Sequence, residues 1–202
     1  MIKYIPNILT TFRILLAPLF FIILISPFNF SYIYAFLLFV IASITDYFDG
    51  KIARKYNVVS KYGLFMDPLA DKILVTSAFI GFLYLDVLSN IIETWMVILI
   101  VSRDILVTIL RLYMKKNKLE MFTSRIAKLK TTTQLVSILF ILACLSSLAI
   151  ENNIGKSIYE NIFIIKYLMI IITIFTVYTG IDYYYRNIKL ITINRDSHKD
   201  IK

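Results

Sequence analysis

Charged residues are scarce in this chain of 202 residues, and cysteine, histidine, proline and glycine are scarcer still. Charged side chains make up 17% of the sequence and hydrophobic ones 59%, whereas soluble domains average roughly 25% and 45–50%. This apolar excess is too large for a soluble domain of this length to bury. The single cysteine, Cys144, excludes an intrachain disulfide scaffold, and the near absence of low-complexity sequence excludes a disordered chain.

Long apolar runs take the place of the missing charges, and each approaches the roughly 20 residues that a transmembrane helix needs. Six such runs predict helices at 7–26, 32–54, 66–88, 91–114, 129–150 and 157–185. The first run lacks the cleavage site of a signal peptide, so we expect it to be retained. With no internal repeat or linker, the sequence predicts an all-α integral membrane protein, a single domain over 1–202 with a short charged tail at about 187–202.

The positive charges gather at every second joint between the predicted helices. They are Lys3 and Arg13 at the start, Lys51, Arg54, Lys55 and Lys61 after the second helix, seven cations from Arg111 to Lys130, and five in the tail. Because cytoplasmic loops collect Lys and Arg, both termini are predicted to be cytoplasmic. The net charge of +9 therefore mostly sets topology, and it does not indicate a nucleic-acid-binding face.

Four aspartates interrupt the second and third apolar runs, where ionisable residues are costly and by default functional. Asp46 and Asp49 are three residues apart, and Asp67 and Asp71 are four apart, so each pair shares a helix face. Carboxylates that converge repel one another unless positive charge lies between them. Oxygen ligands without Cys or His suit Mg²⁺ or Mn²⁺, and two such cations would serve phosphoryl chemistry. An ion-pair network with nearby cations is the alternative.

Small residues accompany these acids. Gly50 and Ala53 follow Asp46 at i+4 and i+7 on the same face, and Gly63 lies in the same stretch. Such a face leaves room for a bulky ligand to approach the backbone. Arg54, just beyond, can hydrogen-bond phosphate in a fork. These residues predict a metal-bound diphosphate site at the cytoplasmic membrane surface.

Together the residues form one pattern: Asp46-x-x-Asp49-Gly50-x-x-Ala53-Arg54, eight residues, then Gly63-x-x-x-Asp67-x-x-x-Asp71. This pattern resembles the complete signature of the CDP-alcohol phosphotransferases, membrane enzymes with six transmembrane helices and a polar cavity open to the cytoplasm. The resemblance implies that two divalent cations are held by Asp46, Asp49, Asp67 and Asp71, and that Asp71 is also the general base. By the same resemblance, the CDP-lipid is held by Asp49, Gly50, Ala53, Arg54 and Gly63. It further implies a homodimer.

Cations in the second half of the chain suggest an acceptor that carries a phosphate. Arg103 lies inside the fourth predicted helix, where an unpaired cation is costly, and Arg111 follows eight residues later, roughly on one side of that helix. Lys128 and Lys130 stand at the entry to the fifth helix. We expect these four residues to bind the acceptor phosphate. Topology anchoring at the membrane surface is the alternative for the two lysines.

Further short motifs are similar to those of the bacterial phosphatidylglycerophosphate synthases, a branch of the same family. They are Asn7-x-x-Thr10-x-x-Arg13, Asp67-Pro68-x-Ala70-Asp71-Lys72, Ser102-Arg103-Asp104 and Lys128-x-Lys130-Thr131-Thr132-x-Gln134. That branch commonly has Glu at the position of Asp104, so we expect Asp104 only to orient Arg103. The likeness makes Asn7, Thr10, Arg13 and Thr131 further candidates around the site.

This second likeness implies transfer from CDP-diacylglycerol to glycerol 3-phosphate at the bacterial cell membrane, with phosphatidylglycerophosphate and CMP as products. Two alternatives within the family use another acceptor: phosphatidylglycerol, which gives cardiolipin, or an inositol phosphate. Outside the family, an intramembrane prenyltransferase also binds a diphosphate lipid through paired acids. A small cation transporter would use the acids as its ion path, although the internal symmetry typical of transporters is not visible.

Overall fold

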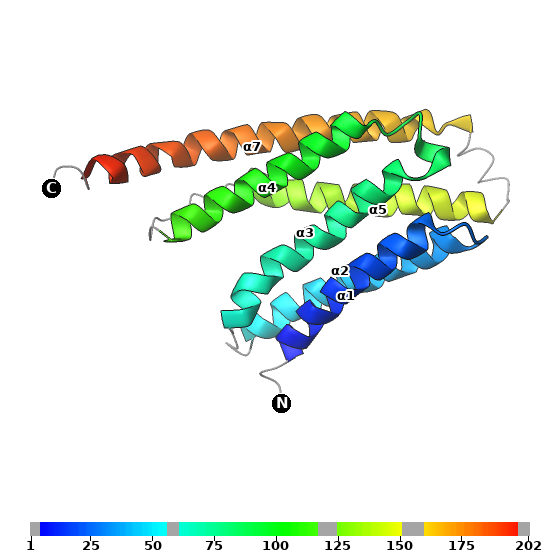
Figure 1. The fold of residues 1–202 in the computed structure, drawn as a ribbon, viewed down its shortest axis with the longest axis horizontal. Helices are drawn as coiled ribbons and strands as arrows, with labels where there is room; N and C mark the ends of the chain where they lie inside the picture. Colours follow the sequence, from blue (N-terminus) through cyan, green and yellow to red (C-terminus); the bar gives the residue numbers. More distant parts are fainter. Residues whose placement is uncertain (1–4, 56–60, 117–124, 151–159, 198–202) are drawn as a thin grey trace. The chain divides into compact units, whose positions relative to one another are not determined.

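The computed structural model describes residues 5–55, 61–116, 125–150 and 160–197. Within them, the backbone alone is described at 5–6, 46–55, 61–65, 67–68, 71, 115–116, 125–128 and 189–197. The described chain is all-α, as predicted (Figure 1). Its helices are α1 (Ile5–Ile25), α2 (Ser31–Lys55), α3 (Lys61–Leu83), the short 3₁₀ helix η2 (Asp86–Leu88), α4 (Thr94–Lys116), α5 (Arg125–Ala149) and α7 (Phe163–Ser197).

Two helices differ clearly from the predicted ranges. α3 begins at Lys61 instead of residue 66, and it ends at Leu83, after which the chain turns through η2. α7 begins at Phe163 and continues to Ser197, so most of the predicted tail is helical. Hydropathy detects only the apolar part of a helix, whereas Lys and Arg are good helix formers and extend both helices beyond it.

Three of the helices are long and apolar enough to cross a membrane among the residues described. They are the stretches Asn7–Ile25 of α1, Leu129–Ala149 of α5 and Phe163–Ile188 of α7. In α2 and α3 the apolar stretches are shorter, Ser31–Thr45 and Lys72–Leu83. Both helices continue beyond these stretches, into residues whose backbone alone is described.

The chain divides into two compact units, and each is described by itself. Unit 1 comprises Met1–Ile92 and Leu135–Lys166. Its α1 contacts both α2 and α3. The rings of Phe20 and Phe39 meet at 5.5 Å in its apolar core. Leu24 packs so closely on Gly81 of α3 that a Cβ there would lie 2.6 Å from Leu24 Cδ2, so glycine permits this helix contact.

Unit 2 comprises Glu93–Gln134 and Tyr167–Lys202, and thus contains α4, the start of α5 and most of α7. The buried residues of α4 are spaced three or four apart and form a stripe along one face. They include Met96, Ile100, Asp104, Val107 and Met114. The buried residues of α7 include four polar ones, Thr173, Thr176, Thr179 and Asn187. The interior of unit 2 is therefore partly polar, and several predicted site residues lie there.

Candidate functional site

The signature acids lie on helical backbone. Asp46 and Asp49 belong to α2, and Asp67 and Asp71 to α3, so the spacings of three and four residues are helical spacings. The side chains of these four aspartates lie outside the described residues. Among the residues that the structure does describe, no group of three or more His, Cys, Asp or Glu could hold a metal ion. The predicted CDP-lipid residues Gly50, Ala53, Arg54 and Gly63 likewise fall where only the backbone is described.

The backbone puts the two acid pairs at matching levels of their helices. Five residues join Lys55, the end of α2, to Lys61, the start of α3. With a rise of about 1.5 Å per residue, Asp49 and Asp67 each lie about 9 Å from these joined ends, and Asp46 and Asp71 about 14–15 Å. Four carboxylates without Cys or His are, by their chemistry, a donor set that suits hard divalent cations.

The candidates on α1 lie mostly inside unit 1. Thr10 and Arg13 are buried, with 0% and 1% of their surface exposed, whereas Asn7 is half-buried. The carbonyl oxygen of Asn7 accepts a hydrogen bond of 2.9 Å from the Thr11 hydroxyl. A cation that sets membrane topology is expected in a loop, whereas the side chain of Arg13 is fully buried. Arg13 lies instead in the interior of unit 1, on α1, which contacts both helices that carry the signature aspartates, α2 and α3.

Unit 2 brings three charged side chains together at Asp104. Its Oδ1 accepts hydrogen bonds from Lys130 Nζ of α5 and from Arg103 Nη1, the latter at 3.1 Å. The three side chains are nearly buried, with 10%, 5% and 12% exposed for Asp104, Lys130 and Arg103. A topology anchor is expected to be exposed at the membrane surface, whereas Lys130 is buried and pairs with a carboxylate. The side chain of Lys128 lies outside the described residues, and Thr131 is exposed.

Threonines of α7 extend this cluster across unit 2. Arg103 Nη2 donates a hydrogen bond of 3.1 Å to Thr179 Oγ1, and the Thr179 hydroxyl donates to the Thr176 carbonyl oxygen at 2.8 Å. Gln134 Nε2 of α5 lies 3.4 Å from Thr176 Oγ1. Polar contacts thus connect α4, α5 and α7. Thr176 and Thr179 were not among the predicted site residues, although their three-residue spacing within an apolar run is a signal for an inward polar face.

Arg103 and Arg111 both lie on α4. Eight residues on an α-helix leave an offset of about 80°, which is compatible with the expectation that they lie roughly on one side. Arg111 comes seven residues after Asp104, nearly two full turns, and so continues the buried stripe of α4. It is half-buried, and its Nε is shielded from solvent with no hydrogen-bond partner among the described residues. Arg111 is therefore a cation placed to meet an anion.

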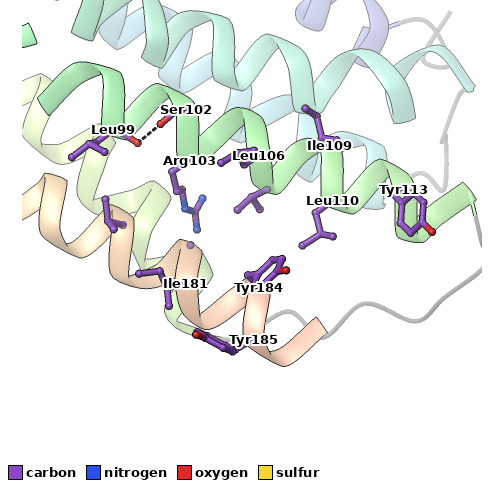
Figure 2. Close-up of a pocket in the computed structure, with 13 residues that line it drawn as sticks. Leu99, Ser102, Arg103, Leu106, Ile109, Leu110, Tyr113, Ile181, Tyr184 and Tyr185 are labelled. Carbon is purple, nitrogen blue, oxygen red and sulfur yellow. Dashed lines mark hydrogen bonds between the residues drawn. The ribbon is translucent and has the colours of Figure 1, made fainter. Parts of the chain in front are cut away.

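A cavity of about 720 Å³ lies between α4 and α7 within unit 2. Figure 2 shows Arg103 extending from α4 toward α7 at this cavity, among apolar and tyrosine side chains. The side chains around it include Leu106, Leu110, Ile181, Tyr184 and Tyr185. Among the described residues that line the cavity, Arg103 is the one that is charged.

Comparison with known proteins gives consistent matches. The family model "CDP-alcohol phosphatidyltransferase" matches residues 3–180. A CDP-diacylglycerol–glycerol-3-phosphate 3-phosphatidyltransferase of Bacillus subtilis is 38% identical over 145 residues, which are 66% of this chain and 73% of the relative. A protein of the same name from Rickettsia typhi is 35% identical over 182 residues, or 90% and 96% of the two chains. The Escherichia coli relative of that name is 35% identical over 144 residues, or 68% and 76%.

Proposed function

Because the chain belongs to the CDP-alcohol phosphatidyltransferase family, we propose that it transfers the phosphatidyl group of CDP-diacylglycerol to glycerol 3-phosphate. The products are phosphatidylglycerophosphate and CMP. Relatives that carry this activity in their name support the choice, and one of them aligns over 90% of this chain and 96% of its own length.

The observation that carries the choice of a phosphorylated acceptor is the positive charge inside unit 2. Lys130 and Arg103 both contact the single carboxylate of Asp104, and Arg111 adds a third cation farther along the same helix. The phosphate of glycerol 3-phosphate can accept charge-assisted hydrogen bonds from cations placed in this way, whereas a neutral acceptor such as glycerol has no anionic group to offer them.

Arg111 and Lys130 are the proposed main contacts of the acceptor phosphate. Among the described residues, the shielded Nε of Arg111 has no hydrogen-bond partner, and Lys130 is held in place by Asp104. Lys128 and Arg103 complete the predicted set. An arginine suits a phosphate because its planar fork can donate two parallel hydrogen bonds.

At the signature, Asp46, Asp49, Asp67 and Asp71 would hold two divalent cations, Mg²⁺ or Mn²⁺. When bound, these ions supply Lewis-acid stabilisation of the charge on the diphosphate. Gly50, Ala53 and Gly63 leave space for the cytidine diphosphate, and Arg54 donates hydrogen bonds to it. The acceptor hydroxyl attacks the β-phosphorus, a new oxygen–phosphorus bond forms, and the bond to the CMP oxygen breaks. The Asp71 carboxylate accepts the proton that the hydroxyl loses.

The proposed setting is a bacterial cell membrane that all six helices cross, with both termini and the site on the cytoplasmic side. The alternation of cationic loops supports this orientation. A single membrane domain and a homodimer are part of the same proposal, and both follow from the family.

A purified-protein assay tests the proposed reaction. The protein is incubated with CDP-diacylglycerol, Mg²⁺ and one labelled acceptor at a time: glycerol 3-phosphate, glycerol, inositol phosphate or phosphatidylglycerol. We expect a new labelled lipid product, with one CMP released per molecule formed, only from glycerol 3-phosphate. Cardiolipin formation from phosphatidylglycerol, labelling by inositol phosphate, or consumption of a prenyl diphosphate in place of the CDP-lipid would each refute the proposed reaction.

A further inference from the structure

Gly180 of α7 lies directly under the side chain of Arg103. A Cβ at this position would come within 2.7 Å of Arg103 Cγ and 3.1 Å of its Nε. Real Cβ atoms do not approach other atoms this closely, so the stem of Arg103 can rest on α7 only where α7 has glycine. The contact is between two helices of unit 2, and Figure 2 shows Arg103 directed toward α7.

The residue before this glycine holds the end of the same arginine. Thr179 Oγ1 accepts from Arg103 Nη2 at 3.1 Å and donates its own proton to the Thr176 carbonyl at 2.8 Å. Because the hydroxyl proton is directed to Thr176, the oxygen lone pairs are directed to the guanidinium. Thr179 therefore orients Arg103, and the adjacent Gly180 provides the space for it.

Arg103 in turn shares the carboxylate of Asp104 with Lys130. Both cations donate to the same oxygen, Oδ1, Arg103 at 3.1 Å. A carboxylate that pairs with two cations neutralises each of them only in part. If Arg103 withdraws, Asp104 pairs more closely with Lys130, and the ammonium group becomes both displaced and less available to an anionic ligand.

We propose that Thr179 and Gly180 are positioning residues that set the affinity for the acceptor phosphate, acting through Arg103 and Asp104 on Lys130. In this proposal both residues act through Arg103 and not through a contact of their own with the phosphate. The inference rests on the proposed function, in which Lys130 binds the phosphate of glycerol 3-phosphate. It assigns to α7 a role in substrate selection that its apolar sequence does not suggest.

The test compares Michaelis constants for the two substrates in wild type, Gly180→Ala, Thr179→Val and Thr179→Ser. Loss of one net hydrogen bond corresponds to about 1 kcal/mol, or about fivefold in a binding constant. We expect Gly180→Ala and Thr179→Val to raise the KM for glycerol 3-phosphate by about fivefold or more and the KM for CDP-diacylglycerol by less than about twofold. Thr179→Ser keeps the hydroxyl and should restore the wild-type KM.

Gly81→Ala is the matched control. It also places a Cβ against a neighbouring side chain, at 2.6 Å from Leu24 Cδ2, but this contact lies in the apolar core of unit 1. We expect this variant to lower the melting temperature while the ratio of the two KM values stays that of the wild type. If Gly180→Ala does not fold, the comparison of Thr179→Val with Thr179→Ser decides the same question.

A double-mutant cycle with Arg103→Met shows whether the effect passes through Arg103. In that background Gly180→Ala should change the KM for glycerol 3-phosphate by less than about twofold, because the guanidinium that passes the effect to Asp104 is gone. A full effect in the Arg103→Met background, or an equal rise of both KM values, would overturn the inference. A wild-type protein that does not use glycerol 3-phosphate refutes the proposed function instead, so the two failures are distinguishable.

Discussion

Replacement of Asp104 by Asn removes the charge that holds two cations inside unit 2 and keeps the shape of the side chain. Lys130 and Arg103 have only 5% and 12% of their side chains exposed, so solvent offers them little compensation. Removal of one partner from a buried ion pair typically lowers the free energy of unfolding by about 3–5 kcal/mol. We expect a loss of the order of 3 kcal/mol here, because Arg103 also donates a hydrogen bond to Thr179. For a chain of this size, 1 kcal/mol corresponds to about 2–4 °C, so we expect the melting temperature to fall by about 6–12 °C.

The assay is thermal unfolding of the purified protein in one detergent, followed by fluorescence or circular dichroism. Asp104→Glu is the matched control, because it keeps the charge and lengthens the side chain by one methylene. We expect Asp104→Glu to lower the melting temperature by less than half as much as Asp104→Asn. The double variant Asp104→Leu with Lys130→Met should recover the part of the loss that is due to Lys130, since apolar pairs often replace buried ion pairs without cost, whereas Arg103 still lacks its carboxylate.

Stability of Asp104→Asn within about 2 °C of wild type would refute the reasoning, because a buried charge without its partner cannot be neutral in energy. Equal losses in Asp104→Asn and Asp104→Glu would refute it in another way, since they would show that shape and not charge is what matters. A double variant that is less stable than either single change would contradict a direct pairing of Asp104 with Lys130.

Three further predictions concern turnover. Arg111→Gln should raise the KM for glycerol 3-phosphate by about tenfold or more, the equivalent of one charged hydrogen bond, and leave the KM for CDP-diacylglycerol unchanged; a rise in both would contradict a role at the acceptor. Asp71→Asn should abolish CMP release while the melting temperature stays within a few degrees of wild type, and residual turnover near the wild-type rate would remove Asp71 as the base. Chelation by EDTA should stop turnover and Mg²⁺ or Mn²⁺ should restore it, whereas activity that persists in EDTA would exclude the proposed cation site.

The helices were predictable from the sequence because apolar runs of membrane length leave few alternatives. Their ends were not, and α3 and α7 show the reason. Charged residues end an apolar run without ending a helix, so α3 begins at Lys61, and α7 continues to Ser197 through a segment that reads as a polar tail. Hydropathy thus locates the part of a helix that meets lipid, while backbone hydrogen bonding and helix propensity decide where the helix stops.

The candidate site, too, could be predicted only in part from the sequence. The four signature aspartates were identifiable because their spacing and chemistry are local properties of the sequence. The contacts of Arg103 were not, because they depend on the register of α7 against α4, which brings Thr179 and Gly180 to an arginine more than seventy residues away.

The helices that look most apolar in the sequence carry polar groups on their inner faces. In α7 the stretch Phe163–Ile188 has a mean hydropathy of 2.0, and its large exposed residues include Ile171, Ile174 and Tyr178. Thr176 and Thr179 are buried on the opposite side. A soluble helix with this average would face its apolar residues inward, but lipid accepts the apolar face and leaves the interior for hydrogen bonds. The high mean hydropathy of such a helix therefore reflects the face that it turns toward lipid. The few polar residues at helical spacing mark its inner face, toward the interior where the candidate site lies.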